Sequence, residues 1–261
     1  MPTTRSAKNI LPALCCLLLS LTACSMNGET VRPSWENGVL RVGVTANYPS
    51  LIHKEAGSGR ISGFEADCAA LLAKRLHSSL QFVDLKWEEQ IPALERKKVD
   101  IIMSAMSVTE MRKLQVAFSE PYLSINQMAL TTIETKPKFP SVQEILATDK
   151  TIGVEKGTTG DLFVQRYCPK AEALYFSSPD DAVTALRDKR IVLFIHDDPV
   201  LRAYSKRTDD LVLLQIPLTS EELAWAVRRD NQSLLKEVNT ALESWKEDGT
   251  IQSLLKKWLP Q

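Results

Sequence analysis

Two segments that follow predicted buried strands carry residues suited to binding a small charged ligand. The apolar run at residues 191–195 is typical of a strand covered on both faces, and Asp197 follows it at the edge where open α/β sheets present ligands. The sequence GTTG at residues 157–160 leads from another predicted strand into a helix, whose first N–H groups can bind an anion. Thr159 could bind through its amide, cap the helix with its hydroxyl, or do both.

The histidines, nucleophiles and glycines of the chain give little support for catalysis. The chain has three histidines, His53, His77 and His196, and lacks the Gly-x-Ser-x-Gly sequence of a nucleophile elbow. Metal-ligand spacings and phosphate-loop glycine patterns are missing from the sequence as well. The 32 basic and 32 acidic residues balance, so no net positive charge would attract nucleic acid. We therefore predict no catalytic residue, metal site, cofactor or nucleic-acid partner.

The N-terminal segment has the composition of a secretory signal followed by a lipidation site. Arg5 and Lys8 precede an apolar stretch at residues 10–21, which is shorter than the roughly 20 residues that a membrane span requires. The stretch ends in LTAC at residues 21–24, which resembles a bacterial lipobox. We expect a signal peptide at residues 1–23, lipid at Cys24 and a tether at residues 24–36. The mature protein would be anchored on the periplasmic or cell-surface side of a bacterial membrane, inner or outer.

From residue 37 onward, apolar runs alternate with segments of helical periodicity, which is the pattern of an α/β fold. After Gly63, apolar residues recur on one face of a helix, at positions 68, 69, 72, 73 and 76. Ser178 followed by Pro179 is typical of a helix start. The predicted strands are residues 39–44, 80–85, 101–103, 151–154, 173–176, 191–195 and 223–227. Further helices are predicted around Pro92, from residue 159, and over residues 234–245 and 251–258.

Short motifs in a fixed order along residues 40–259 resemble the extracellular solute-binding proteins of family 3, the polar-amino-acid receptors of ABC importers. The motifs are NYP at residues 47–49, GFEAD at 63–67, IPAL at 91–94, DIIMSAMSVTEMR at 100–112, FSEPY at 118–122, GTTG at 157–160, HDDP at 196–199, and DGT at 248–250 with KW at 257–258. Each motif alone is weakly specific. Their common order makes the resemblance strong.

The resemblance implies an α/β fold of the type II periplasmic-binding-protein class, in which two lobes joined by two hinge strands hold the ligand in a cleft. Lobe 1 would comprise residues 37–121 and 224–261, lobe 2 residues 127–219, and the hinge residues 122–126 and 220–223. Cys68 would then belong to lobe 1 and Cys168 to lobe 2. Because a disulfide between the lobes would oppose hinge motion, we expect two free thiols.

The resemblance also implies which residues bind the two charges of a free amino acid. Arg112 takes the place of the family's carboxylate-binding arginine, whose planar guanidinium can bind both oxygens. Thr158 and Thr159 would provide further carboxylate contacts from lobe 2. Asp197 takes the place of the acid that pairs with the ammonium group.

Polar turn residues and aromatic residues would complete the implied site. Ser104 and Ser107 flank the turn after the strand at residues 101–103 and would add hydroxyl or carbonyl contacts, with ordinary turn chemistry as the alternative. Tyr48 and Trp87 match the aromatic positions that enclose the ligand side chain in the family. A core role is an equal alternative for Trp87.

Departures from the family pattern bear on the ligand's side chain. Thr45 stands where relatives commonly carry an acid, which disfavours arginine, lysine or histidine as the ligand. Glu155 stands where glutamine-binding relatives have a basic residue, which disfavours an acidic ligand. His196 could hydrogen-bond an amide side chain. On these grounds we favour a neutral polar or modestly apolar amino acid.

Three functions are compatible with the implied fold. We favour a monomeric, non-catalytic lipoprotein that presents a free amino acid to the permease and ATPase subunits of an ABC importer. A periplasmic cyclohexadienyl dehydratase would use the same arginine and a general acid, for which Glu155 is the candidate. A sensory lipoprotein would need the same hinge and the same differential affinity for the closed state.

Overall fold

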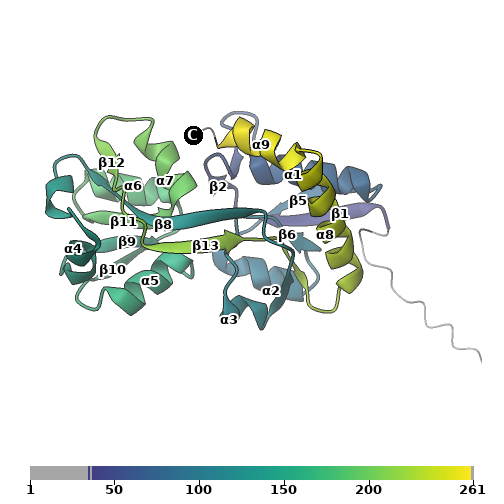
Figure 1. Ribbon diagram of the computed structural model, residues 1–261, viewed down its shortest axis with the longest axis horizontal. Coiled ribbons are helices and arrows are strands. Elements are labelled where there is room, and N and C mark those ends of the chain that lie inside the picture. The colour runs from purple at the N-terminus through teal and green to yellow at the C-terminus, as the bar shows by residue number, and fades with distance from the viewer. Residues whose placement is uncertain (1–34, 36, 260–261) are drawn as a thin grey trace, which may run out of the picture. The chain divides into compact units, whose positions relative to one another are not determined.

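The computed structural model describes residue 35 and residues 37–259, which form one compact unit (Figure 1). The predicted signal peptide, Cys24 and all of the predicted tether except Trp35 lie outside the described residues. Within the described part, the strands form two mixed sheets and a small antiparallel sheet, with helices packed against them. No helix of this part is both long and apolar enough to cross a membrane.

The first sheet combines strands from both ends of the described chain. Its spatial order is β5 (Ser79–Asp84), β1 (Val39–Val44), β6 (Ile101–Ile102), β14 (Ala226–Arg228) and β7 (Val116–Phe118). β1 is parallel to β5 and β6, whereas β14 is antiparallel to β6 and β7. Its helices are α1 (Phe64–Arg75), α2 (Gln90–Glu95), α3 (Glu110–Lys113), α8 (Gln232–Glu247) and α9 (Thr250–Trp258), which contact the sheet or one another.

Helix α1 begins at a glycine because the chain there approaches a neighbouring loop closely. Gly63 has a φ of 131°, and a Cβ on it would lie 2.3 Å from the carbonyl oxygen of Leu51. The predicted apolar face of the helix is confirmed for Cys68, Ala69 and Leu72, which are fully buried, whereas the predicted position 76 caps the end of the helix and is partly buried. Their burial fixes the helix on the first sheet and anchors the small sheet of β2 (Asn47–Tyr48), β3 (Ile52–Lys54) and β4 (Ile61–Ser62) beside it.

The strands of the second sheet come from the middle of the sequence. Its spatial order is β10 (Ala173–Phe176), β9 (Ile152–Glu155), β11 (Leu193–Asp197), β8 (Leu123–Thr132) and β12 (Leu211–Leu213). β9 is parallel to β10 and β11, and β8 is antiparallel to β11 and β12. The accompanying helices are α4 (Val142–Ala147), α5 (Thr159–Tyr167), α6 (Pro179–Arg187) and α7 (Asp198–Ser205). The parallel strands bring the carboxyl ends of β9 and β11 to one edge.

Two antiparallel strands run between the two sheets. β8 pairs with β13 (Thr219–Leu223) from Leu123 opposite Leu223 to Gln127 opposite Thr219. Figure 1 shows the two strands side by side between the halves of the compact unit. The predicted hinge segments fall within or next to this pairing. The exact lobe and hinge boundaries stay a prediction.

Five of the seven predicted strands differ from the structure in their bounds. For those predicted at residues 80–85, 101–103 and 151–154, the ends differ by one residue at most, and the other two differ by more. The strand predicted at residues 191–195 is β11, which begins and ends two residues later, so that Asp197 is its last residue. The single strand predicted at residues 223–227 is wrong, because β13 ends at Leu223 and β14 begins at Ala226. Between them the chain changes partners, since the N–H of Trp225 donates to the Ser119 hydroxyl at 3.0 Å. A continuous apolar run therefore hides a break in pairing.

The two described cysteines are free, as predicted, and both are buried. Cys68 lies in α1 on the first sheet and Cys168 follows α5 on the second. Burial raises the pKa of the Cys68 thiol well above its usual value and that of the Cys168 thiol to about 11. Both thiols are therefore protonated and unreactive near neutral pH.

Candidate ligand-binding site

A narrow cavity between the two sheets brings together most of the predicted site residues. Its lining residues are Tyr48, Trp87, Ala105, Ser107, Arg112, Thr158, Thr159, His196 and Asp197. The space open to the centre of a water molecule is about 10 Å³, which is room for about one water. An amino acid therefore requires the cavity to widen before it enters. Of the predicted residues, Ser104 is missing from the lining.

Arg112 enters the cavity from the short helix α3 (Glu110–Lys113). Thr109 caps this helix by accepting the Arg112 N–H at 3.2 Å. The guanidinium donates through Nη1 to the carbonyl oxygen of Ser107 at 2.8 Å and through Nη2 to that of Gly157 at 3.1 Å. It also lies 5.1 Å from the ring centroid of Trp87. Burial lowers the pKa of Arg112, yet the guanidinium stays charged because its usual value is so high.

The start of α5 faces Arg112 from the second sheet. The structure corrects the expected cap, because Thr158 and not Thr159 caps the helix, with its hydroxyl accepting the Asp161 N–H at 3.3 Å. The Thr158 hydroxyl also donates to the carbonyl oxygen of Glu155 at 2.7 Å. The hydroxyl of Thr159 instead accepts a hydrogen bond from the side-chain amide of Gln127 at 3.1 Å. Thr159 is thus held at the cavity by the second sheet.

A glycine lets α5 begin this close to the sheet. A Cβ on Gly160 would lie 2.9 Å from the carbonyl oxygen of Ile195 and 3.0 Å from Oε1 of Gln127. Any side chain at this position would therefore push the first turn of the helix away from β11. The N–H groups of the first turn keep their place beside the cavity because the glycine is there.

Asp197 lies at the end of β11, 7% exposed, and accepts a hydrogen bond from the amide of Gln127. Burial raises the pKa of Asp197 to about 6, while the nearby His196 and Arg112 act in the opposite direction. Beside it, His196 receives the backbone N–H of Asp197 on Nδ1 at 2.7 Å and places Nε2 3.3 Å from Oε2 of Glu155. Burial lowers the pKa of His196, but Glu155 and Asp197 outweigh it, so the net shift is upward.

The two predicted aromatic residues form adjoining walls of the cavity. The ring of Tyr48 meets that of Trp87 at 6.2 Å between centroids, with an interplanar angle of 62°, and meets His196 at 5.4 Å. Tyr48 is 2% exposed, and its pKa is raised well above the usual value. Burial is the largest cause, and the negative charges of Glu155 and Asp197 add to it. Trp87 is half-buried and donates through Nε1 to the Gly157 carbonyl oxygen at 3.1 Å. It also packs against core residues, in agreement with the alternative of a core role, and its contact with a ligand side chain stays a prediction.

The predicted turn serines occupy different places. Ser107 lines the cavity and supplies the carbonyl oxygen that accepts from Arg112. Ser104 lies behind it, and its hydroxyl accepts from the N–H of Thr45 at 2.8 Å and from the side-chain amide of Gln90 at 3.4 Å. In this structure Ser104 positions the turn. A contact from Ser104 to a ligand stays a prediction.

Gln127 and Ala105 are contributions that the sequence analysis missed. Gln127 is fully buried in β8, and the only sequence signal for it was a polar residue inside an apolar strand. Ala105 contributes through its backbone, which has a φ of 53° and donates its N–H to the buried carboxylate of Glu65 at 2.8 Å. An alanine carries no sequence signal for such a role.

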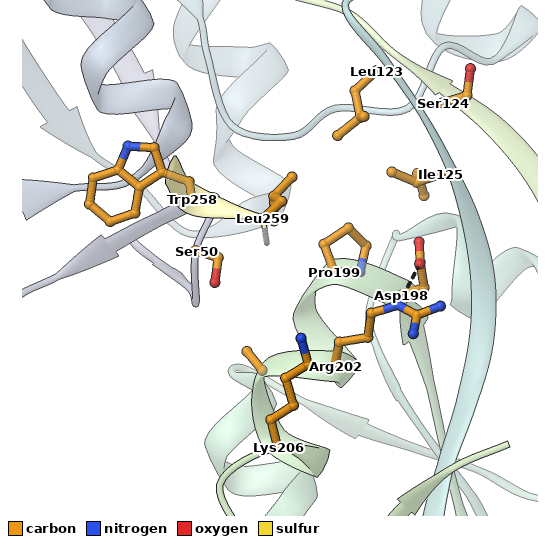
Figure 2. Close-up of a pocket in the computed structure, with 11 residues that line it drawn as sticks. Ser50, Leu123, Ser124, Ile125, Asp198, Pro199, Arg202, Lys206, Trp258 and Leu259 are labelled. Atoms are coloured by element: carbon orange, nitrogen blue, oxygen red, sulfur yellow. Dashed lines mark hydrogen bonds and ion pairs between the residues drawn. The ribbon is translucent and has the colours of Figure 1, made fainter. Parts of the chain in front are cut away.

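A larger cavity of about 570 Å³ lies near the strands that connect the sheets (Figure 2). Its walls come mainly from β8, α7 and the end of α9, and include the apolar side chains of Leu123, Ile125 and Leu259. Its Arg202 is half-exposed and paired with Asp198 of the same helix at 3.1 Å. It lacks the buried, opposed charges of the narrow cavity, which we therefore regard as the candidate site. In the part of the chain that the structure describes, no group of His, Cys, Asp and Glu is arranged to hold a metal.

The family model of the bacterial extracellular solute-binding proteins, family 3, matches residues 40–261. The chain belongs to this family. It is 30% identical to the ABC transporter arginine-binding protein 1 of Escherichia coli over 227 residues, which cover 85% of this chain and 91% of that protein. It is 28% identical to the ABC transporter glutamine-binding protein GlnH of Bacillus subtilis over 258 residues, which cover 94% and 93%.

The comparison with solved structures confirms the predicted fold class. The ancestral amino acid-binding protein AncCDT-1, described as a precursor of cyclohexadienyl dehydratase, superposes with a TM-score of 0.80 at 34% identity. The match covers 85% of this chain and 96% of that one. The two mixed α/β sheets are therefore those of a type II periplasmic binding protein, as the family resemblance implied.

Proposed function

We propose that this solute-binding protein binds a free amino acid in the narrow cavity and delivers it to the permease and ATPase subunits of an ABC importer. The observation that carries the proposal is the presence of a buried arginine, Arg112, and a buried carboxylate, Asp197, in the walls of one small cavity. A zwitterion supplies the matching charges, a carboxylate for Arg112 and an ammonium group for Asp197.

The remaining walls suit the rest of an amino acid. The start of α5 offers backbone N–H groups near Thr159 for the second carboxylate oxygen. Tyr48 and Trp87 offer aromatic faces for the aliphatic part of a side chain. Affinity around micromolar, about 8 kcal/mol, suits a receptor of this kind. The relatives reported above are named for arginine and glutamine, so the comparison leaves the side-chain class open.

Opening of the cavity belongs to the same proposal. The carbonyl oxygen of Gly157, which follows a strand of the second sheet, accepts hydrogen bonds from both Arg112 and Trp87, which lie in short helical segments on the side of the first sheet. Rotation about β8 and β13 would break both hydrogen bonds and widen the cavity. The expected lobes and hinge, at residues 122–126 and 220–223, fit such a motion.

A thermal-shift screen of the purified chain against the twenty amino acids, followed by calorimetry, tests the proposal. A ligand that binds only the folded state must raise the melting temperature. At least one amino acid should do so and bind with one-to-one stoichiometry. The absence of any shift, once co-purified ligand has been excluded by mass spectrometry of the denatured protein, would contradict the proposal.

The anchoring part of the proposal concerns residues outside those described. We propose that lipid on Cys24 holds the monomeric protein at the periplasmic or cell-surface side of a bacterial membrane, in line with the extracellular family. Labelling of growing cells with a palmitate analogue should mark the wild-type protein and leave Cys24→Ala unlabelled. Labelling of both proteins would contradict the lipid site.

A dehydratase is the second candidate, favoured by the similarity to the AncCDT-1 structure. The proposed general acid, Glu155, is 3% exposed and is absent from the described lining of the cavity, with His196 in front of it. A general acid must come within hydrogen-bond reach of its substrate. The geometry therefore supports binding over catalysis. Formation of phenylpyruvate from prephenate by the purified protein would reverse this preference.

A further inference from the structure

A buried acid–histidine pair, Glu155 and His196, borders the candidate cavity. Glu155 ends β9 and His196 lies in the neighbouring parallel strand β11. Both side chains are almost fully buried, and Oε2 of Glu155 lies 3.3 Å from Nε2 of His196. His196 lines the cavity, whereas Glu155 lies behind it. Any effect of Glu155 on a ligand therefore passes through His196 or Tyr48, both of which interact with Glu155 and line the cavity, or acts through space.

The hydrogen bonds of His196 define the charge of the pair. The backbone N–H of Asp197 donates to Nδ1 at 2.7 Å, so Nδ1 carries a lone pair. The ring proton is then on Nε2, where it faces the carboxylate of Glu155. In this form the imidazole is neutral and the pair carries one negative charge.

The negative charge of the Glu155–His196 pair has no positive partner when the α-carboxylate and α-ammonium groups of a bound amino acid are paired with Arg112 and Asp197. Arg112 balances the ligand carboxylate and Asp197 balances its ammonium group. Among the described residues, Glu155 is paired with His196 and with no lysine or arginine. The other groups around His196 are the neutral Tyr48 of β2 and the further acid Glu221 of β13. An uncompensated buried charge is costly, and a cation on the ligand would remove that cost.

We propose that Glu155, acting through His196, makes the cavity selective for an amino acid with a positively charged side chain. The inference rests on the proposed amino-acid binding and names its ligand class. The sequence alone favours a neutral ligand because Thr45 replaces an acid on the first sheet. The structure supplies an acid from the second sheet instead.

The aromatic walls give a cationic side chain a path towards the pair. Arg112 stacks on Trp87, Trp87 meets Tyr48, and Tyr48 meets His196. A ligand held at its carboxylate by Arg112 can therefore extend its side chain along Tyr48 to His196. Aromatic faces bind the aliphatic part of arginine or lysine and also attract the cation.

A matched pair of ligands tests the inference directly. L-Arginine and L-citrulline have nearly the same shape, but citrulline is neutral. At about pH 8.5, calorimetry with the wild-type protein should show roughly tenfold or tighter binding of arginine than of citrulline. Glu155→Gln should reduce this ratio of affinities to about threefold or less, mainly by weakening the binding of arginine. Glu172→Gln, which removes an exposed acid from the same sheet region, should leave the ratio unchanged.

Wild-type protein at lower pH provides the same test without a substitution. At about pH 5.5, protonation of His196 neutralises the pair, so the arginine-to-citrulline ratio should fall. Protonation of Asp197 affects the ammonium group of both ligands and cancels in the ratio. L-Lysine, measured beside L-glutamine, should follow arginine.

The possible results separate this inference from the proposed function. If citrulline or glutamine binds as tightly as arginine and lysine, or if Glu155→Gln melts like the wild type and keeps the full ratio, the inference is wrong and amino-acid binding stands. If none of the twenty amino acids or citrulline binds to the wild type, the proposed function itself fails.

Discussion

Replacement of Arg112 by alanine should abolish most amino-acid binding while leaving the protein folded. Arg112 is 8% exposed, and its guanidinium would pair with a ligand carboxylate that is buried beside it. Removing one partner of such a pair costs about 2–5 kcal/mol, or roughly 30- to 5,000-fold in Kd. A micromolar affinity would thus become about 30 μM or weaker. In the unliganded protein the change removes two hydrogen bonds but also a buried charge, so these effects partly offset each other.

Isothermal titration calorimetry with the best amino acid from the thermal-shift screen measures this effect, and the melting temperature verifies folding. Arg112→Lys keeps the charge but loses the planar fork, so we expect an intermediate affinity. Arg202→Ala is the matched control, because it removes a half-exposed arginine from the larger cavity of Figure 2. Wild-type affinity in a folded Arg112→Ala protein would refute the site. Loss of binding in Arg202→Ala alone would transfer the site to the larger cavity.

Three further predictions concern the groups that support this site. Burial raises the pKa of Asp197 to about 6, and only its ionised form pairs with an ammonium group. Affinity for a neutral amino acid should therefore be full above about pH 7 and fall about tenfold per pH unit well below pH 6. Calorimetry that shows the same affinity at every pH would exclude that pairing. Gly160→Ala places a Cβ 2.9 Å from the Ile195 carbonyl oxygen, so urea unfolding should show a loss of about 1–3 kcal/mol, and an unchanged midpoint would mean that α5 can shift freely. Glu65→Gln should lower the free energy of unfolding by about 1–3 kcal/mol in the same assay, because an amide has one acceptor oxygen where the carboxylate accepts from Ala105 and Trp225 on two. An unchanged free energy would show that the cost of burying the charge of Glu65 equals the gain from its hydrogen bonds.

Local patterns in the sequence predict much of the fold because they reflect one element at a time. The apolar run at residues 39–44 is β1, and the Ser178–Pro179 start begins α6 with Ser178 as its cap. The run at residues 223–227 misleads because apolar residues on both sides of a change of partner are equally buried. Pairing of β13 with β8 and of β14 with β6 is a property of the tertiary fold, which hydrophobicity does not encode.

The candidate site shows the same division. Residue type alone does not distinguish Arg112 among 32 basic residues, so its role comes from the family motif, whereas Asp197 is also indicated by its place after a buried strand. Gln127 and Glu155 are harder to place, because their functions depend on which strands lie beside β11. In the structure β8 brings the Gln127 amide to Asp197, and β9 brings Glu155 to His196. Sheet order therefore decides which side chains surround the predicted carboxylate.

The contacts across the narrow cavity suggest how ligand binding and closure are linked. Arg112 and Trp87 both donate to the carbonyl oxygen of Gly157, so the closed cavity holds hydrogen bonds of its own before a ligand enters. A ligand carboxylate offers Arg112 a charged acceptor in place of a neutral carbonyl oxygen, which makes the stronger hydrogen bond. Binding can shift the protein towards the closed form only by the ligand's difference in affinity for the two forms, and this exchange of acceptors at Arg112 is one contribution to that difference. The guanidinium is therefore both the carboxylate contact and the group whose partner changes on closure, and Arg112→Ala should weaken the closed form with and without ligand.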